Sequence, residues 1–520
     1  MSRFAPLIEA VVKHSYDSAS VQGLTGTLVA DGQTQTFSYG PSTYSNYRDG
    51  VLESFTIGEG TSTQTLPTPP SDVGAAPMPT ELKMTYGGMV GESVDMNPLV
   101  TLLTGSGDGE GPQTIIGSMT FGKVEVEAGD LATFSMGETS ASDITVDPSR
   151  GPILTQADTI ATALADNEEP DVPSLVNLML NLYGAFGIGS YEQGGIDVSF
   201  TEGTARLGSF VIENLNASGL GRLALNGASV ESSDISGSLG KLEVADVVFP
   251  EREALLAAVM ASATGIQPDP QTVMAALPYL GRLTISDLSF SDAARGDIAL
   301  GLFETRAANF ISSIPTQISI ALEGLSFPAA LLNNPMAQGV ATAVGADPVK
   351  ADGTITLGWD EASQLVSLDE DFEIDNIGRL QISAAMSGIP RFVFAEPQRI
   401  QEALVTAALN NVSARFDDEG ITNFGMAMVS QQSGMPADQF PAIISQQVGM
   451  QVSQLTNNTD LAGEVSGALQ AYLSDPQSLE ISAAPAAPVP LAQVIGAVMT
   501  APQALPQLLG LSIAANSAAQ

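Results

Sequence analysis

The sequence predicts an α+β protein in which a repetitive antiparallel sheet dominates and amphipathic helices cap its strand modules. Three observations lead to this prediction. A short unit of alternating apolar residues recurs along the chain, turn residues usually follow its copies, and segments of helical period come after groups of strands. Helices that follow strand groups, rather than alternating with single strands, favour an antiparallel sheet over a parallel βαβ fold.

The recurring unit is clearest between residues 206 and 250. Its copies begin at Leu207, Leu220, Leu239, Leu280 and Ile377, with a weaker copy at Phe121. Apolar side chains alternate with polar or small ones, which is typical of a half-buried strand. The Gly-Arg or Gly-Lys pair found in most copies fits a bend or bulge at strand entry, with a cation on the solvent side that discourages edge pairing.

Consecutive copies are predicted to be adjacent antiparallel strands, because sequential strands commonly pair. The side chains expected to be buried are Leu207, Phe210, Ile212, Leu220, Leu223, Leu225, Leu242 and Val244, and those expected to be exposed are Arg222 and Lys241. Strict alternation places Leu207 and Phe210 on opposite faces. Burial of both therefore requires a bulge at the glycine between them.

Composition limits the class of protein. The 520 residues are 44% hydrophobic but only 6% aromatic, and 51 of them are glycine, which favours small side chains and many turns. The formal net charge is −40, from 58 acidic and 18 basic residues. Nucleic acid is therefore a very poor partner, and an anionic membrane surface is also disfavoured.

Targeting signals and cysteine give little direct guidance. Cysteine is absent, which excludes disulfides and thiolate chemistry and is compatible with an oxidising compartment. Glu9 and Lys13 interrupt the only apolar run near the start, so either the protein is cytoplasmic or an export signal lies outside this sequence. No window reaches the roughly 20 apolar residues of a membrane span, and Leu491 to Leu511 is predicted to form two short packed helices.

Four segments are predicted. Residues 1–64 form a β-meander with a hairpin turn at Asp31-Gly32, residues 65–81 a proline-rich linker or loop, residues 82–394 the repetitive sheet with capping helices, and residues 395–520 a mainly helical region that packs on the sheet. Helices are expected at 171–186, 251–263, 269–280, 328–345 and 397–411, and the later strands at 478–483 and 509–514.

No catalytic constellation is visible, so we expect no enzyme activity, no catalytic or cofactor-binding residues and no cofactor. His14 is the only histidine, lies near the start of the chain and has no G-x-S-x-G motif to accompany it. The phosphate-loop motif is also missing, and the glycines from Gly184 to Gly189 lack dinucleotide spacing. They are predicted to end a helix and begin a turn. A paired-carboxylate glycosidase stays open, although Trp359 is the only tryptophan available as a sugar platform.

Two acidic stretches are weighed as metal sites. In the first, Asp369, Asp371, Glu373 and Asp375 share one face of an extended chain and offer the hard oxygen ligands that Ca²⁺ prefers. The stretch lacks the glycine and the bidentate glutamate of an EF-hand loop, because Ile374 and Leu380 occupy those positions. A solvated acidic strand face is the favoured interpretation, and Ca²⁺ binding stays open. The second stretch, 417–420, is predicted to be a β-turn.

Three segments carry a family resemblance. They are residues 16–23, the Leu-Gly-Arg-Leu units with the Phe-Pro pairs at 249–250 and 327–328, and residues 414–420 with 431–435. Together they resemble uncharacterised exported β-rich proteins of alphaproteobacteria and, more distantly, the AsmA-like and DUF945-like envelope families. The resemblance implies an envelope protein without catalytic residues, whose sheet contacts lipid or other envelope proteins.

Two functions from different classes remain. The first is a periplasmic envelope protein whose sheet forms a scaffold or groove for a lipid or protein partner, with the helices at 171–186 and 491–511 as walls or lids. The second is a secreted or cell-surface β-repeat protein of the adhesin type. The copies begin 13, 19, 41 and 97 residues apart from Leu207 to Ile377, which is too irregular for a solenoid and favours the first function. Simple closure of an ordinary core is the plainer role for these helices.

Overall fold

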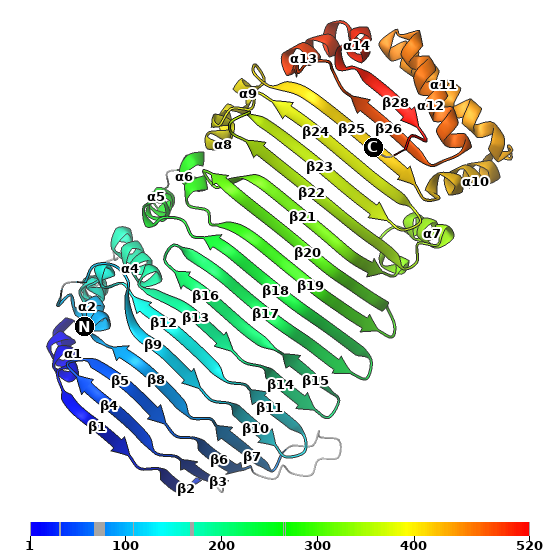
Figure 1. Cartoon of the computed structure of the whole chain (residues 1–520). Coiled ribbons are helices and arrows are strands. Elements are labelled where there is room, and N and C mark those ends of the chain that lie inside the picture. The colour runs from blue at the N-terminus through cyan, green and yellow to red at the C-terminus, as the bar shows by residue number, and fades with distance from the viewer. Residues whose placement is uncertain are drawn as a thin grey trace. The chain divides into compact units, whose positions relative to one another are not determined.

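A computed structural model describes residues 2–30, 33–66, 79–107, 109–166, 171–263, 265 and 267–518. The chain divides into two compact units, Met1–Leu283 and Thr284–Gln520. Strand β19 (Tyr279–Asp292) runs through the division. Each unit contains an antiparallel sheet with helices at the ends of its strands (Figure 1). The predicted α+β class, with strands dominant and the C-terminal part richer in helix, is therefore confirmed.

The strands of the first unit form two rows. The strands nearer the helices pair in the order β1-β4-β5-β8-β9-β12-β13-β16-β17-β18, and the others in the order β2-β3-β6-β7-β10-β11-β14-β15-β17. Their bounds are β1 (Ser15–Val21), β2 (Leu24–Ala30), β3 (Gln33–Tyr39), β4 (Ser42–Arg48), β5 (Val51–Ile57), β6 (Gly60–Thr65), β7 (Glu81–Tyr86), β8 (Met89–Asp95), β9 (Gln113–Phe121), β10 (Val124–Ala128), β11 (Ala132–Met136), β12 (Thr139–Val146), β13 (Phe186–Gln193), β14 (Ile196–Phe200), β15 (Gly203–Leu207), β16 (Ser209–Asn216), β17 (Gly219–Ser232) and β18 (Ile235–Val248).

The helices of the first unit lie at one end of the strands, and the turns from β10 to β11 and from β14 to β15 lie at the other (Figure 1). They are η1 (Ser2–Phe4), α1 (Ala5–Val12), α2 (Asn97–Thr104), η2 (Pro148–Arg150), α3 (Ile153–Ala165), α4 (Val172–Gly184), α5 (Arg252–Ala263) and α6 (Pro270–Ala275). Leu102 of α2, Ile153 of α3 and Val146 of β12 are buried together in a small core. Helix packing thus closes the strand ends and leaves the middle of the sheet uncovered.

A line of glycines separates the two strand rows of the first unit. The line contains Gly40, Gly58, Gly87, Gly88, Gly122, Gly137, Gly194, Gly195, Gly208 and Gly227. The backbones approach closely here, since Gly87 N donates to Lys123 O at 2.6 Å and Gly122 N donates to Gly88 O at 2.7 Å. A Cβ at Gly87 would lie 2.4 Å from the Cα of Gly122, and one at Gly58 would lie 2.8 Å from the Cα of Gly40, so only glycine fits at these positions.

Replacing Gly87 by alanine is therefore expected to lower the free energy of unfolding of the first unit by about 2–3 kcal/mol, because the new methyl group overlaps backbone atoms. Gly339→Ala is the matched control. No atom lies within 4 Å of a Cβ at Gly339, which is inside a helix, so the change is expected to stabilise by about 0.5–1 kcal/mol. Hydrogen exchange of the full chain measures both effects. Equal protection of β7 and β9 in wild type and Gly87→Ala would contradict the prediction.

The second unit has one strand order, β20-β21-β22-β23-β24-β25-β26-β28, and β27 also pairs with β25. The bounds are β20 (Gly296–Ile311), β21 (Ile314–Phe327), β22 (Val349–Asp360), β23 (Leu365–Ile374), β24 (Gly378–Ser387), β25 (Ala408–Asp418), β26 (Ser478–Ala483), β27 (Val489–Pro490) and β28 (Leu511–Ala515). The helices are η3 (Ala329–Leu331), α7 (Pro335–Val344), α8 (Phe392–Ala395), η4 (Pro397–Arg399), α9 (Ile400–Ala403), α10 (Ile421–Ser433), η5 (Ala437–Gln439), α11 (Phe440–Thr456), α12 (Thr459–Ser474), α13 (Leu491–Thr500), η6 (Pro502–Ala504) and α14 (Leu505–Leu509).

Helices α11 and α12 pack against each other, and α12 lies against β28 (Figure 1). Strand β28 is the last strand of the second unit, so its free edge would otherwise present unpaired backbone groups. Covering an edge with a helix is a common way to prevent pairing with another chain. The two short helices predicted at 491–511 are present as α13 and α14.

The predicted segments differ from the observed division. Strands β5 and β6 pair with β8 and β7, so residues 1–64 join the following sheet instead of forming a separate meander. Most of the proline-rich stretch 65–81, and the turn at Asp31-Gly32, lie outside the described residues. The helix predicted at 397–411 is wrong beyond Ala403, because β25 begins at Ala408 and pairs along β24.

The recurring units are adjacent antiparallel strands, as predicted, in β16, β17 and β18. The glycine of the first copy marks an irregularity, since Gly208 N donates to both Asn226 O and Gly227 O at the break between β15 and β16. Leu207 and Phe210 are both half-buried, and so are the other side chains expected in the core. Arg222 and Lys241 were expected to be exposed. They are half-buried instead, because both bind a buried carboxylate.

Candidate functional site

One face of the first unit carries a surface that is apolar except at Thr139 and Gln193, here called the apolar band. It consists of two neighbouring cross-strand rows on β5, β8, β9, β12, β13, β16, β17 and β18. The first row is Phe55, Gly91, Met119, Ala141, Tyr191, Ile212, Leu223 and Val244, and the second is Ile57, Met89, Phe121, Thr139, Gln193, Phe210, Leu225 and Leu242. Its large side chains are half-buried or exposed, whereas the core of a sandwich would bury them.

The opposite face of the same strands is polar. The rows that alternate with the apolar band are Ser54, Glu92, Ser118, Ser142, Ser190, Glu213, Arg222 and Ala245, and Thr56, Val90, Thr120, Ser140, Glu192, Val211, Ala224 and Glu243. Successive side chains of a strand point to opposite faces, so alternating sequences such as Arg-Leu-Ala-Leu produce one wet face and one apolar face. The sheet is amphipathic over its whole width in this unit.

Aromatic rings lie over glycines of neighbouring strands on the apolar band. A Cβ at Gly91 would lie 2.2 Å from the ring of Phe55, so the ring occupies the space that a side chain would fill. Phe37 and Gly26 in the other strand row, and Phe372 and Gly353 in the second unit, repeat the arrangement. Such pairs cover the exposed backbone of strand glycines and flatten the surface.

A row of residues with left-handed backbone borders the apolar band on its helix side. It contains Ser93, Asp143, Asn214 and Asp246, whose φ angles lie between 51° and 56°. Each side chain leans against a glycine of the next strand, and a Cβ at Gly189 would lie 2.6 Å from the Cβ of Asp143. Asn and Asp tolerate this backbone region better than most residues. The glycines of two Leu-Gly-Arg units, Gly221 and Gly281, occupy such positions opposite Asn214 and Asp246.

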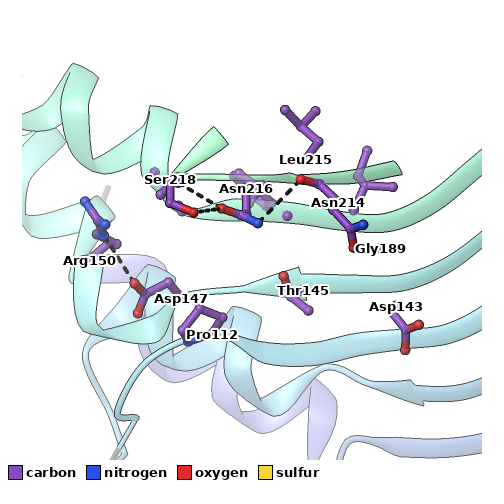
Figure 2. Close-up of a pocket in the computed structure, with 16 residues that line it drawn as sticks. Pro112, Asp143, Thr145, Asp147, Arg150, Gly189, Asn214, Leu215, Asn216 and Ser218 are labelled. Carbon is purple, nitrogen blue, oxygen red and sulfur yellow. Dashed lines mark hydrogen bonds and ion pairs between the residues drawn. The ribbon is translucent and has the colours of Figure 1, made fainter. Parts of the chain in front are cut away.

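A pocket of about 430 Å³ opens where this row meets the helices. Figure 2 shows Asp143 and Thr145 on one strand and Asn214, Leu215 and Asn216 on another. The pocket is also lined by Phe186, Ile188 and the end of α4, so apolar and polar groups both face it. Its volume lies within the range of small-molecule sites.

Hydrogen bonds hold the helix side of the pocket in place (Figure 2). Asp147 is buried, accepts from Ser149 N at 3.1 Å and pairs with the guanidinium of Arg150 at 3.2 Å. On the opposite strand, Asn216 Oδ1 accepts from Ser218 N at 2.8 Å and from Ser218 Oγ at 2.6 Å. These bonds hold the side chains of Asp147 and Asn216 at the rim of the pocket.

The polar face of the first unit contains one buried carboxylate among cations. Glu243 is 3% exposed and lies within 3.3 Å of charged nitrogens of Arg222, Lys241 and Arg282. Burial by itself raises the pKa of Glu243, but hydrogen bonds from Lys241 and Arg222 hold that pKa below its ordinary value. The cluster ties β17, β18 and β19 together, which is a structural role.

The acidic stretch predicted as a strand face is found in β23 and the turn after it. Asp371 binds the guanidinium of Arg379 through two contacts, and this pairing lowers its pKa. Asp375 lies 3.9 Å from Lys350 Nζ. Two of the four carboxylates of this stretch are therefore paired with cations. Within the part of the chain that the structure describes, no group of three or more His, Asp or Glu side chains is arranged to hold a metal ion.

The remaining sequence candidates do not come together. His14 is exposed between α1 and β1, and its carbonyl accepts from Asp49 N at 3.2 Å. Trp359 is 7% exposed in a core of the second unit and is no sugar platform. Gly184 ends α4, as expected, but Gly187 and Gly189 lie in strand β13 and not in a turn, and all three line the pocket. Sequence reasoning missed that second role, because the opposite wall comes from residues 214–218.

The sheet of the second unit also has one mainly apolar face and one polar face. One cross-strand row consists of Ile320, Ile355, Glu370, Ile382, Ala414, Ile481 and Ile513, and is apolar except for Glu370. A row on the other face consists of Ser319, Thr356, Asp369, Ser383, Ser413, Ser482 and Ser512. An amphipathic sheet is therefore a property of both units. None of the described helices is long and apolar enough to cross a membrane.

Comparison with known families gives a match over part of the chain. A family model described as "Uncharacterized protein" matches residues 371–516, the stretch from within β23 to just beyond β28. No curated protein and no solved structure matches the chain. The resemblance to AsmA-like and DUF945-like proteins therefore stays a prediction, and the chain is similar, over its last quarter and a little more, to that one family.

Proposed function

We propose that this chain is a non-enzymatic envelope protein that binds the acyl chains of a lipid on its apolar band. The observation that carries the proposal is a broad sheet face of large apolar side chains that helices cover only at the strand ends. Monomeric proteins rarely leave contiguous apolar surfaces of this kind in water, and such surfaces usually bind a partner.

Acyl chains suit this surface better than a second copy does. Two copies would bring together two formal charges of −40, which repel each other. An acyl chain has no charge and needs no hydrogen bonds, and the backbone groups of the band are already paired within the sheet. The ring of Phe55 covers Gly91 on the band and adds apolar surface that a flexible chain of methylene groups can contact.

The pocket beside the band provides a place for the polar end of such a lipid. Gly189 lines the pocket, and Tyr191 of the apolar band follows two residues later on the same face of β13. Asp143, Thr145 and Asn214 bring a carboxylate, a hydroxyl and an amide to the pocket. A head group with amine or hydroxyl donors would find acceptors there, while its chains extend over the band.

Tyr191→Asp is expected to weaken binding of a fluorescent long-chain fatty acid at least about tenfold, because a carboxylate beneath the acyl chain loses its hydration. Ser190→Asp is the matched control. Ser190 is the preceding residue and lies on the polar face, so this variant should bind as the wild type does. Lipid extraction and mass spectrometry of the purified protein would identify a natural ligand. Absence of probe binding, or equal loss in both variants, would reject the proposal.

Residence in the periplasm remains part of the proposal. The acidic balance, the absence of cysteine and the resemblance to exported proteins support it. Cell fractionation of the native protein tests it, and recovery in the cytosol alone would contradict it. A protein partner on the same face is the competing occupant. It would be indicated by a stoichiometric protein complex whose formation is blocked by Tyr191→Asp and not by added fatty acid.

A further inference from the structure

Helix α4 faces the opposite way from an ordinary amphipathic helix. Its polar side chains Ser174, Asn177 and Asn181 point toward α3 and α5 and line a polar pocket with Gln156 and Arg252. The other side exposes large apolar side chains, namely Val172, Leu175, Met179, Leu182 and Tyr183. The sequence predicted an apolar side on this helix, but packing places most of it in water.

Two hydrogen bonds fix this rotation of the helix. Arg252 of α5 donates to Asn177 Oδ1 at 2.8 Å, and Asn181 Nδ2 donates to Gln156 Oε1 of α3 at 2.9 Å. Rotating the apolar side inward would break both bonds and leave polar groups buried without partners, which is costly. Of the side chains of α4, only Leu178 packs against the small core that contains Leu102, Val146 and Ile153. The outward apolar surface is therefore built into the packing of three helices.

We propose that α4 docks on the surface of a neutral, zwitterionic phospholipid bilayer and lies in the plane of its interface. The proposal rests on the lipid-binding function, since it names the place where lipid would reach the protein. The helix has 13 residues and is thus about 20 Å long, too short for a bilayer core of about 30 Å. A short helix with one apolar side lies along the interface instead.

Charge favours a zwitterionic bilayer over a charged protein, a second copy of the chain or an anionic membrane as the partner of this surface. Helix α4 contains no acidic or basic side chain, so it offers no partner for a charged protein surface. The net charge of −40 opposes both a second copy of the chain and an anionic membrane. A zwitterionic bilayer carries no such penalty. Tyr183 and Phe186, both half-exposed, supply the aromatic residues that commonly lie at the level of the head groups.

The position of α4 connects this surface with the pocket. Gly184, Ala185 and Phe186, at the end of the helix, line the pocket that opens beside the apolar band. A lipid that leaves the bilayer at α4 would therefore meet the pocket first and the apolar band next. Docking and acyl-chain binding involve different residues, so they can be tested separately.

Flotation of the full chain with phosphatidylcholine vesicles tests the inference. The wild type is expected to float with the vesicles, and the double variant Met179→Asp, Leu182→Asp is expected to lose at least about tenfold in bound fraction. Met336→Asp is the matched control, since Met336 on α7 is 75% exposed and Met179 is 69% exposed. Replacing part of the phosphatidylcholine by phosphatidylserine should weaken binding of the wild type, and added salt should restore part of it.

Several outcomes would overturn the inference. These are a wild type that stays with the unbound fraction, a double variant that floats as well as the wild type, and a control that loses binding equally. Dimerisation of the wild type without vesicles, abolished by the double variant, would assign the surface to a second copy instead. Fatty-acid binding in the absence of vesicles should be unchanged by the double variant. Tyr191→Asp is expected to lose fatty-acid binding and to float as the wild type does. Acyl-chain binding on the apolar band and bilayer docking by α4 can therefore fail independently of each other.

Discussion

Replacing Trp359 by alanine is expected to lower the free energy of unfolding of the second unit by about 4 kcal/mol. Trp359 is 7% exposed in a core with Ile311, Ile389 and Ala407. Its Nε1 donates to Ile389 O at 2.9 Å, and its ring centre lies 4.7 Å from that of Phe394. Alanine would leave a cavity and an unpaired carbonyl, and both effects destabilise the fold.

Trp359→Phe separates the two contributions. Phenylalanine keeps most of the packing with Phe394 and loses the hydrogen bond to Ile389, so about 1–2 kcal/mol of destabilisation is expected. Hydrogen exchange of the full chain, followed in peptides from β21 to β23, measures the local free energy of opening. Equal protection in the wild type and in Trp359→Ala would show that this core does not support the second unit.

Replacing Glu243 by glutamine is expected to lower the free energy of unfolding of the first unit by about 2–3 kcal/mol. Removing one partner of a buried ion pair costs roughly 3–5 kcal/mol, and the side chains of Arg222, Lys241 and Arg282 remain about one third exposed, which reduces the cost. Glutamine keeps the size of the side chain but leaves three cations facing a neutral amide. Mutual repulsion of these cations adds to the loss.

The dependence of this effect on pH follows from the direction of the pKa shift. The pKa of Glu243 in the folded protein lies below its ordinary value of 4.5. A carboxyl with a lowered pKa contributes stability that is complete above the ordinary value and disappears as pH falls through the pKa of the folded protein. The difference between the wild type and Glu243→Gln should therefore be largest at neutral pH and shrink below about pH 4.5.

Glu213→Gln is the matched control for Glu243→Gln. Glu213 binds only one of the same cations, Arg222, at 3.0 Å, and its side chain is 40% exposed. An exposed pair of this kind contributes about 0–1 kcal/mol. Urea unfolding measured at several pH values, with hydrogen exchange in β17 and β18 as the local measurement, compares the variants. A difference for Glu243→Gln that does not change with pH would contradict the assigned ion pairs.

Strand positions were largely predictable from the sequence, because alternation with a period of two is a local property. Residues 478–483 were predicted as a strand and form β26 with the same bounds, and the units at Leu220 and Leu239 lie in the adjacent strands β17 and β18. The segment 397–411 was harder. Its first residues do form short helices, and pairing with β24 overrides the helical pattern from Ala408 onward.

The candidate site was only partly predictable. The alternation of the Leu223 and Leu225 unit already implied one apolar and one polar face. The pocket was not visible, because Asp143, Gly189 and Asn214 are far apart in the sequence and meet only through the pairing of β12, β13 and β16. The glycines of the recurring units were predicted to form bends. Their close contacts with residues of neighbouring strands could not be predicted, because these contacts depend on the strand register.

The sequence by itself determined that this protein has a β-dominated, amphipathic sheet, a strongly acidic surface and no cysteine chemistry, since composition and local period require no knowledge of partners. Tertiary structure decided which apolar surfaces remain open. Helix α4 has an apolar and a polar side in any environment, and only its hydrogen bonds with Arg252, which donates, and with Gln156, which accepts, turn the polar side inward. The cations around Glu243 are likewise brought together by strand pairing, because the energy of a buried charge depends on neighbours that local sequence does not specify.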